Sequence, residues 1–155
     1  LLAVAPERRV FVEKLNDKLL EQGCELVIKE VKSGYTATYQ LEKKTVMNWV
    51  FRKTGIWARI YGDNAGRYEE VIAALPADMQ KKMTASRDCK RLIDPDACSG
   101  TCVKGFVYSL NGETQKKCRN DGMLFLLTEE TAEYIAGLIC AEVAVRKLAL
   151  QQLNR

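Results

Sequence analysis

The chain has 155 residues, of which 47% are hydrophobic and 28% are charged, and its formal net charge is +4. This hydrophobic fraction excludes an intrinsically disordered chain, and 10 glycines with 3 prolines exclude a collagen-like one. There is no histidine, which excludes Ser-His-Asp and Cys-His catalysis and histidine-ligated metal sites. The composition predicts a single domain over residues 1–155, with six cysteines as its most unusual feature.

The first half of the chain predicts one helix followed by an antiparallel sheet. Pro6 suits the first turn of a helix, apolar residues recur at four-residue spacing from Phe11 to Leu19, and Gly23 ends the run. Apolar and polar residues then alternate with a period of two, which is typical of half-buried strands. The alternation predicts a meander of about four antiparallel strands, over 26–31, 35–41, 45–51 and 56–61.

Two shorter helices are predicted after the meander. The loop 62–66 supplies Asp63 or Asn64 as the cap of a helix that starts near Arg67 and ends near Leu75. Pro76 then begins a second helix, which runs to about residue 85. The two glycines of the loop do not have the spacing of a phosphate-binding motif, so we interpret the segment as a capped turn.

A hairpin and a long helix complete the pattern. Asn111-Gly112 is a strong hairpin signal, and it separates predicted strands over 106–110 and 113–118. Thr128 is expected to cap a helix whose apolar residues continue to Leu148 at spacings of four and three. The predicted fold class is therefore α+β: an antiparallel sheet, made of the meander and the C-terminal hairpin, packs against N-terminal, central and long C-terminal helices.

Four of the six cysteines lie in one segment, residues 86–119. Eight, three and 15 residues separate them in turn: Cys89, Cys98, Cys102 and Cys118. Thiolate sulfur is a preferred ligand of zinc, and four thiolates complete a closed tetrahedral site. Pro95 and Gly100 allow the chain around Cys98 to turn tightly, and the Asn111-Gly112 hairpin can return Cys118 to the same place. We therefore predict one structural Zn²⁺ held by these four cysteines.

The spacing of the cysteines leaves other states open. Zinc-binding pairs usually have two intervening residues, whereas Cys98 and Cys102 have three. The four could instead form two disulfides, or pack as free thiols, as we expect for Cys24 and Cys140. The alternative function is a thiol-based redox sensor or a small cysteine-dependent enzyme, because basic neighbours favour thiolates. Without a histidine to act as base, an enzyme is the less favoured interpretation.

Basic and aromatic residues suggest two further kinds of ligand. Residues 81–119 hold nine basic and four acidic side chains and could bind nucleic acid, with Phe106 and Tyr108 stacking on bases. Because the sequence pI is only about 8.7 and Lys90, Arg91, Lys104, Lys116, Lys117 and Arg119 also offset thiolate charge, nucleic acid is the third choice. Five aromatic side chains of the meander could line a small-ligand pocket or simply form core: Tyr35, Tyr39, Trp49, Trp57 and Tyr61.

The cysteine segment resembles part of a known group of sequences. The run from Cys89 to Ile93, Pro95, Gly105-Phe106 and Lys117-Cys118-Arg119, together with the other two cysteines, is similar to the C-terminal part of a group of short uncharacterised bacterial proteins. The resemblance covers roughly residues 70–140, and the four cysteines are its most specific feature. Since the group is a domain of unknown function, the resemblance implies a bacterial source and a cysteine site, and no activity.

Location and partners are predicted from the two ends of the sequence. The first residues lack the basic start and apolar length of a signal peptide, and no apolar run is long enough to cross a bilayer. We therefore predict a cytoplasmic protein with no membrane partner. Leu148, Leu150 and Leu153 exceed what one small core requires, which predicts either a homodimer through the C-terminal helix or packing of these leucines on the sheet of the same chain. The predicted function is a binding or structural domain for an unknown small ligand or protein.

Overall fold

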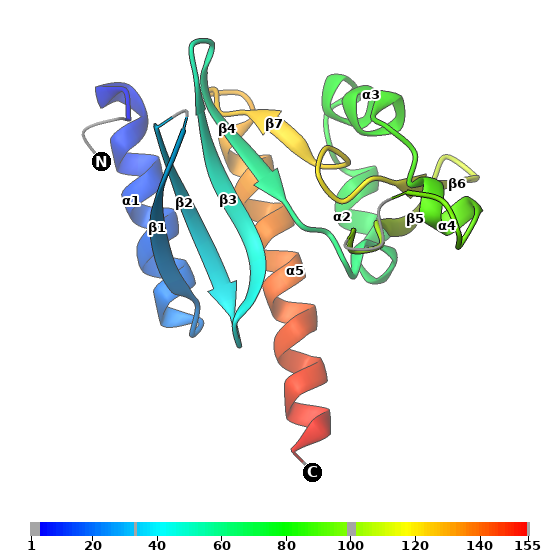
Figure 1. The fold of residues 1–155 in the computed structure, drawn as a ribbon. Coiled ribbons are helices and arrows are strands. Elements are labelled where there is room, and N and C mark those ends of the chain that lie inside the picture. Colours follow the sequence, from blue (N-terminus) through cyan, green and yellow to red (C-terminus); the bar gives the residue numbers. More distant parts are fainter. Residues whose placement is uncertain (1–3, 33, 99–101, 155) are drawn as a thin grey trace.

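A five-stranded antiparallel sheet forms the centre of the molecule (Figure 1). The computed structural model describes residues 4–32, 34–98 and 102–154. In these residues the strand order of the sheet is β1-β2-β3-β4-β7, with bounds β1 Glu25–Val31, β2 Gly34–Leu41, β3 Lys44–Arg52, β4 Gly55–Ile60 and β7 Leu124–Leu126. The first four strands confirm the predicted meander. The fifth strand, β7, lies in the apolar run 123–127 and pairs with β4 through Trp57–Leu126 and Ala58–Phe125.

Two helices cover one face of this sheet (Figure 1). Helix α1, Pro6–Glu21, and helix α5, Ala132–Leu153, contact each other and the strands beneath them. Gly23 has φ +93°, a left-handed conformation that suits glycine, and it ends the α1 run as predicted. The predicted cap at Thr128 is wrong: α5 begins at Ala132 with Thr131 at its N-cap position, and the Thr128 hydroxyl instead accepts a hydrogen bond from the Thr131 N–H at 3.1 Å in the preceding turn.

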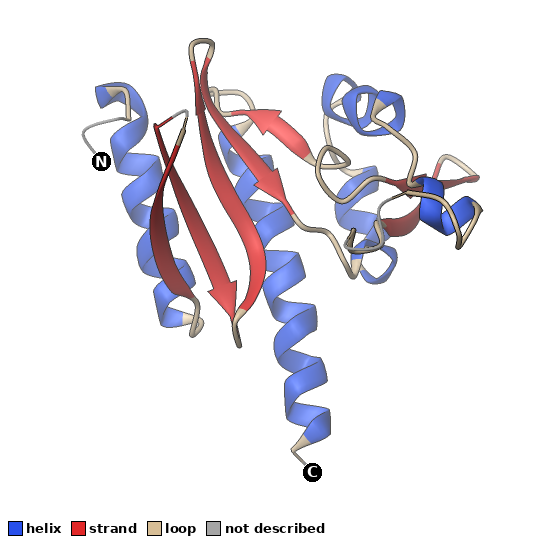
Figure 2. Cartoon of the chain, viewed as in Figure 1, coloured by secondary structure: helices blue, strands red, loops and turns tan. Residues whose placement is uncertain are grey.

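A smaller layer lies beside the β4–β7 end of the sheet (Figure 2). It contains the 3-10 helix η1 Ala65–Arg67, α2 Glu69–Ala73, α3 Ala77–Ala85, α4 Lys90–Ile93, β5 Phe106–Leu110 and β6 Glu113–Lys117. Strands β5 and β6 form a separate two-stranded sheet, closed by Asn111 at φ 53° and Gly112 at φ 81°, as the hairpin signal predicts. The Leu110 side chain is buried in the same core as those of α1 and α5. The architecture confirms the α+β prediction.

The predicted cap of the first central helix is wrong. Helix α2 begins at Glu69, after η1, and neither Asp63 nor Asn64 caps it with its side chain. The Asp63 carboxylate instead accepts hydrogen bonds from Arg119, and the Asn64 side-chain amide donates to Glu142. The side chains of Asp63 and Asn64 therefore bind residues that are distant in the sequence, and they do not cap the helix.

The suggested base-stacking role of two aromatic residues is wrong. Phe106 and Tyr108 are buried to 2% and 1% exposure, so their rings cannot stack on the bases of a nucleic acid. The aromatic residues of the meander divide between the two alternatives: Tyr39 and Trp49 belong to the core and also line one groove, whereas Tyr35 is 60% exposed. Trp57 and Tyr61 are occupied elsewhere, with cationic side chains over their rings: Arg52 and Lys82 over Trp57, and Arg119 over Tyr61.

Within the described ranges, every helix is too short or too polar to cross a membrane.

Candidate metal centre

Cys89 sits where two backbone segments meet. Its N–H donates to the carbonyl of Lys116 at 2.9 Å, and Asp88 bridges to Lys117, so residues 87–89 extend the hairpin on the β6 side. The Cys89 thiol is 6% exposed and accepts a hydrogen bond from the Gly105 N–H at 3.3 Å. Burial alone raises the pKa of this thiol, but the backbone N–H groups of Gly105, Leu92 and Arg91 outweigh it and lower the pKa. Such N–H donors stabilise a thiolate.

Gly105 is required for this close approach. A Cβ at position 105 would lie 1.8 Å from the carbonyl oxygen of Lys117 and 3.0 Å from the Cβ of Cys89. The missing side chain lets the 105 backbone pass directly over the end of β6, with its N–H aimed at the Cys89 sulfur. The absence of a side chain at Gly105 therefore allows the backbone to pass this close to Lys117 and Cys89.

Cys118 follows β6 and begins a tight turn. Its N–H donates to the carbonyl of Arg87 at 2.8 Å, and its carbonyl accepts the N–H of Gly122 at 2.8 Å. These contacts place Cys118 opposite Arg87, on the strand segment that pairs with residues 87–89. The predicted return of Cys118 through the Asn111-Gly112 hairpin is what brings the two cysteines into neighbouring strands.

Cys98 and Cys102 approach from the loop that follows α4. A hydrogen bond with the Cys98 thiol raises the pKa of Cys102, and burial and the charges of Cys98, Cys118 and Cys89 raise it further. All three other cysteines therefore lie close enough to act electrostatically on Cys102. Arg91 donates to the Cys102 carbonyl, which ties α4 to the returning chain. The turn that was expected at Gly100 falls in 99–101, outside the described residues.

The four thiols are gathered without forming a closed ligand set. In the part of the chain that the structure describes, no three Cys, Asp or Glu side chains are grouped closely enough to hold one metal ion. All six cysteines are free thiols. Cys24 is buried in the core, and that burial raises its pKa, while Cys140 is half-buried on α5. The donor chemistry fits zinc, since thiolate sulfur is a preferred zinc ligand and Cys89 already has thiolate-stabilising N–H donors.

The cations around the cysteines differ from those expected. Lys117 is 3% exposed, and its ammonium group donates to the carbonyls of Thr84 and Ser86 and to the Asp88 carboxylate. Arg119 is paired with Asp63. The pKa of Arg87 is raised, first by its hydrogen bond to Asp121 and by the Asp121 charge, and then by the charges of Cys118 and Cys98. Lys117 and Arg119 therefore have internal partners, whereas Lys90, Lys104 and Lys116 remain exposed.

The carboxylate of Glu142 is buried on α5, on a different element from the four clustered cysteines. Glu142 is 0% exposed and accepts four hydrogen bonds of 2.7 to 3.0 Å, from the Asn64 N–H, the Asn64 amide, the Tyr68 hydroxyl and Arg146. Burial, and then the Glu142 charge, hold the pKa of Tyr68 far above its ordinary value. Arg146 also donates to the carbonyls of Thr45 and Tyr61. Each polar group here has a partner, so the network is an anchor between α5 and the 62–68 loop.

The sequence carried one signal for this anchor. Glu142 is the charged residue that interrupts the apolar stretch from Tyr134 to Val145, and a carboxylate inside such a stretch implies a buried partner. Its partners Asn64 and Tyr68 are more than seventy positions away, so no local pattern connects them.

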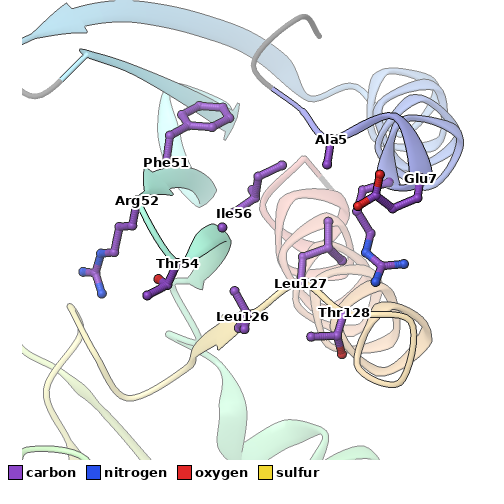
Figure 3. A pocket seen from close by; sticks show the side chains of 11 residues that line it. Ala5, Glu7, Phe51, Arg52, Thr54, Ile56, Leu126, Leu127 and Thr128 are labelled. Atoms are coloured by element: carbon purple, nitrogen blue, oxygen red, sulfur yellow. The ribbon is translucent and has the colours of Figure 1, made fainter.

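A pocket of about 330 Å³ lies at one end of the sheet, where α1 begins and β3 turns into β4. Figure 3 shows Arg52 and Glu7 on opposite sides of this pocket, with the apolar side chains of Ile56, Leu126 and Leu127 between them. Because its charged groups do not converge on a common point, this pocket offers weaker chemistry than the cysteine cluster.

Comparison with known proteins adds no relative. No family model matches the chain, and no match is found among curated proteins or among solved structures. The resemblance to uncharacterised bacterial proteins therefore remains a prediction, and the cysteine cluster is the feature that carries a functional argument.

Proposed function

We propose that this chain is a binding or structural domain of a reducing, cytoplasmic compartment, and that a structural Zn²⁺ clips its cysteine segment together. The ligands would be the thiolates of Cys89, Cys98, Cys102 and Cys118. The observation that supports the proposal is that Cys98, Cys118 and Cys89 all act electrostatically on Cys102, while Cys89 and Cys118 flank the Asp88–Lys117 bridge. When bound, the ion would supply cross-linking energy, and the chain's own N–H groups would orient and stabilise the Cys89 thiolate.

The segment that carries two of these cysteines has little burial to hold it. Helix α4 has no buried residue, Ile93 is 65% exposed, and Val103 is 62% exposed. Ordering each residue costs roughly 1 to 2 kcal/mol of conformational entropy. A structural zinc site contributes on the order of 10 kcal/mol, which offsets the ordering of roughly five to ten residues around the ligands. The strand β5 differs, because Phe106 is buried in the core.

Elemental analysis of the purified chain tests the zinc clip directly. We expect one Zn²⁺ per chain, and we expect Cys118→Ser to lose the metal while Cys140→Ser retains it. Amide hydrogen exchange of Cys118→Ser should show lost protection between residues 88 and 105. The sheet from β1 to β4 should keep its protection. A narrower range than the whole 86–119 segment is expected because β5 packs in the core.

Two results would contradict the clip. One is a metal-free chain whose residues 88–105 are as protected as the sheet. The other is a sulfur–sulfur bond of about 2.05 Å between any two of the four cysteines.

A thiol redox sensor is the second candidate, favoured by the hydrogen-bonded pair Cys98 and Cys102 beside the low-pKa thiol of Cys89. Thiol titration separates the two functions. A zinc clip leaves few titratable thiols in the native chain, whereas a sensor presents several reactive ones. If Cys118→Ser leaves hydrogen-exchange protection intact everywhere and abolishes only thiol reactivity, the sensor replaces the clip.

The homodimer through the C-terminal helix also remains a proposal. Leu148 is 51% exposed and Leu153 is 80% exposed, while Leu150 packs partly against the core. The end of α5 projects beyond the sheet (Figure 1), where a second copy could cover these leucines. Sedimentation of the double variant Leu148→Glu/Leu153→Glu tests this interface: a monomeric double variant would support it, and a dimeric one would rule it out.

A further inference from the structure

Strand β1 is an edge of the central sheet and carries apolar side chains into solvent. It pairs with β2 on one side only, and no described strand pairs with its other side. Leu26 is 38% exposed, Ile28 is 63% exposed and Val31 is 41% exposed. The free N–H and C=O groups of such an edge are a template for another strand, and soluble proteins usually protect it with charged side chains, a bulge or a proline. Strand β1 has no proline, and its charged residues Glu25, Lys29 and Glu30 alternate with exposed apolar ones, so that a partner must satisfy both kinds of side chain.

The same edge opens into an apolar groove. A groove of about 490 Å³ runs between α1 and the helix-covered face of the sheet. On the sheet side its lining includes Leu26 and Ile28 of β1, with Tyr39 and Trp49 behind them. Leu26 faces Tyr39 and Ile28 faces Ala37 across the β1–β2 ladder, which places both β1 side chains on the groove side. The groove therefore ends at the free edge.

We propose that a second copy of this chain occupies this edge, with β1 pairing antiparallel to β1 about a two-fold axis at Val27. The residues of β1 select this register. It places Glu25 opposite Lys29 of the other copy, and Leu26 opposite its Ile28, each pair occurring twice. The two ion pairs lie on the face away from the helices, and the two apolar pairs lie at the groove. Opposite charge therefore meets opposite charge, and apolar meets apolar.

Neighbouring registers lack this complementarity. A two-fold axis perpendicular to the sheet keeps the groove faces of both copies on one side, so residues of the same parity must oppose each other. An axis at Ile28 would set Leu26 against Glu30, and an axis at Lys29 would set two lysines against each other. Among residues 25–29, only the axis at Val27 leaves no like-charge and no apolar–charged pair, and Glu30 then lies opposite Cys24, just before the start of β1.

The pairing joins two sheets into one continuous sheet and removes both free edges. The two grooves meet at the axis, so that Leu26 and Ile28 of each copy are covered by those of the other. This dimer does not involve the end of α5, and it is therefore independent of the zinc clip and of the C-terminal helix.

Sedimentation at low ionic strength tests the interface with exposed residues only. The parent chain should form a dimer of about 35 kDa at high-micromolar concentration, twice the 17.5 kDa of one chain. Glu25→Lys and Lys29→Glu should each raise the dimer dissociation constant roughly tenfold or more, since each creates two like-charge pairs. Mixing the two single variants should restore dimers, because Lys at 25 and 29 in one chain then faces Glu at 29 and 25 in the other. The double variant Glu25→Lys/Lys29→Glu should dimerise like the parent.

The matched control is Leu148→Glu/Leu153→Glu, which should leave the dimer intact. A parent chain that is monomeric at high-micromolar concentration would overturn the proposal. So would single variants that dimerise as tightly as the parent, or a mixture that stays as weak as its two components. Loss of the dimer only in the Leu148→Glu/Leu153→Glu control would assign the interface to the C-terminal helix instead.

Discussion

Replacing Glu142 by glutamine tests whether its network anchors the fold. The substitution keeps the size of the side chain and one acceptor oxygen, but it removes the negative charge that faces Arg146 at 2.7 Å. It also turns an N–H₂ group toward a ring of donors, which are the Asn64 N–H and amide, the Tyr68 hydroxyl and Arg146. At least one donor then loses its acceptor in a site with 0% exposure.

The expected loss follows from the burial of the pair. Removing one partner of a buried ion pair costs about 3 to 5 kcal/mol, because the other charge is left without compensation. Arg146 keeps the carbonyls of Thr45 and Tyr61 and a longer contact to Asp63, so we expect the lower end, about 3 kcal/mol. For a chain of this length each kcal/mol shifts the melting temperature by roughly 2 to 4 °C, so Tm should fall by about 10 °C.

Urea and thermal unfolding measure this effect, with Glu129→Gln as a matched control. Glu129 is exposed before α5, so its substitution should change the free energy of unfolding by less than about 0.5 kcal/mol. A double-mutant cycle with Arg146→Met should give a coupling energy above about 1 kcal/mol. If Glu142→Gln costs no more than its control, or if the cycle shows no coupling, the anchor interpretation is refuted.

Three further outcomes are expected. Tyr108→Phe should stabilise the chain by about 1 kcal/mol in urea unfolding, because it removes a buried hydroxyl that has no hydrogen-bond partner; a loss of stability would show that the hydroxyl is bound. Burial raises the pKa of Tyr39 and of Tyr108 to about 12 from 10, so the folded state holds these protons more tightly than the unfolded state. Stability should therefore be complete below pH 10 and fall as the pH rises from 10 to 12, which melting curves at alkaline pH would show; a flat profile there would contradict it. Gly105→Ala should lower both Tm and the zinc content, because its Cβ would collide with the Lys117 carbonyl oxygen; unchanged zinc would mean that the Cys89 site tolerates the shift.

Local signals in the sequence predicted local structure well. The boundaries of α3 and of the β5–β6 hairpin agree with prediction, because Pro76 and Asn111-Gly112 act on neighbouring residues through backbone dihedral angles. The pairing of β7 with β4 was not predictable in the same way. Residues 61–123 separate the two strands, and an apolar run of three residues carries no information about which edge it joins.

The candidate site likewise combines features that local sequence predicts with features that depend on tertiary contacts. Cysteine spacing predicts a four-cysteine site, and the structure shows that Cys98, Cys118 and Cys89 act electrostatically on Cys102; binding of an ion by the four stays a prediction. The backbone N–H donors to Cys89 and the role of Arg87 depend on tertiary placement. Gly105 had a sequence signal only in being a glycine near a cysteine, and its purpose becomes clear from the contact its Cβ would make.

The failed cap at Asn64 shows how such conflicts between local and distant partners are resolved. A capping side chain contributes about 1 kcal/mol to its helix. A fully buried carboxylate without donors costs several kcal/mol, and Glu142 therefore recruits both the N–H and the amide of Asn64. Because satisfying the buried carboxylate involves the larger free energy, the Asn64 side chain binds Glu142, and helix α2 starts at Glu69 without a side-chain cap. Asn64→Ala should accordingly destabilise the chain through Glu142, and combining it with Glu142→Leu, which removes the buried charge, should cancel much of that cost in a double-mutant cycle.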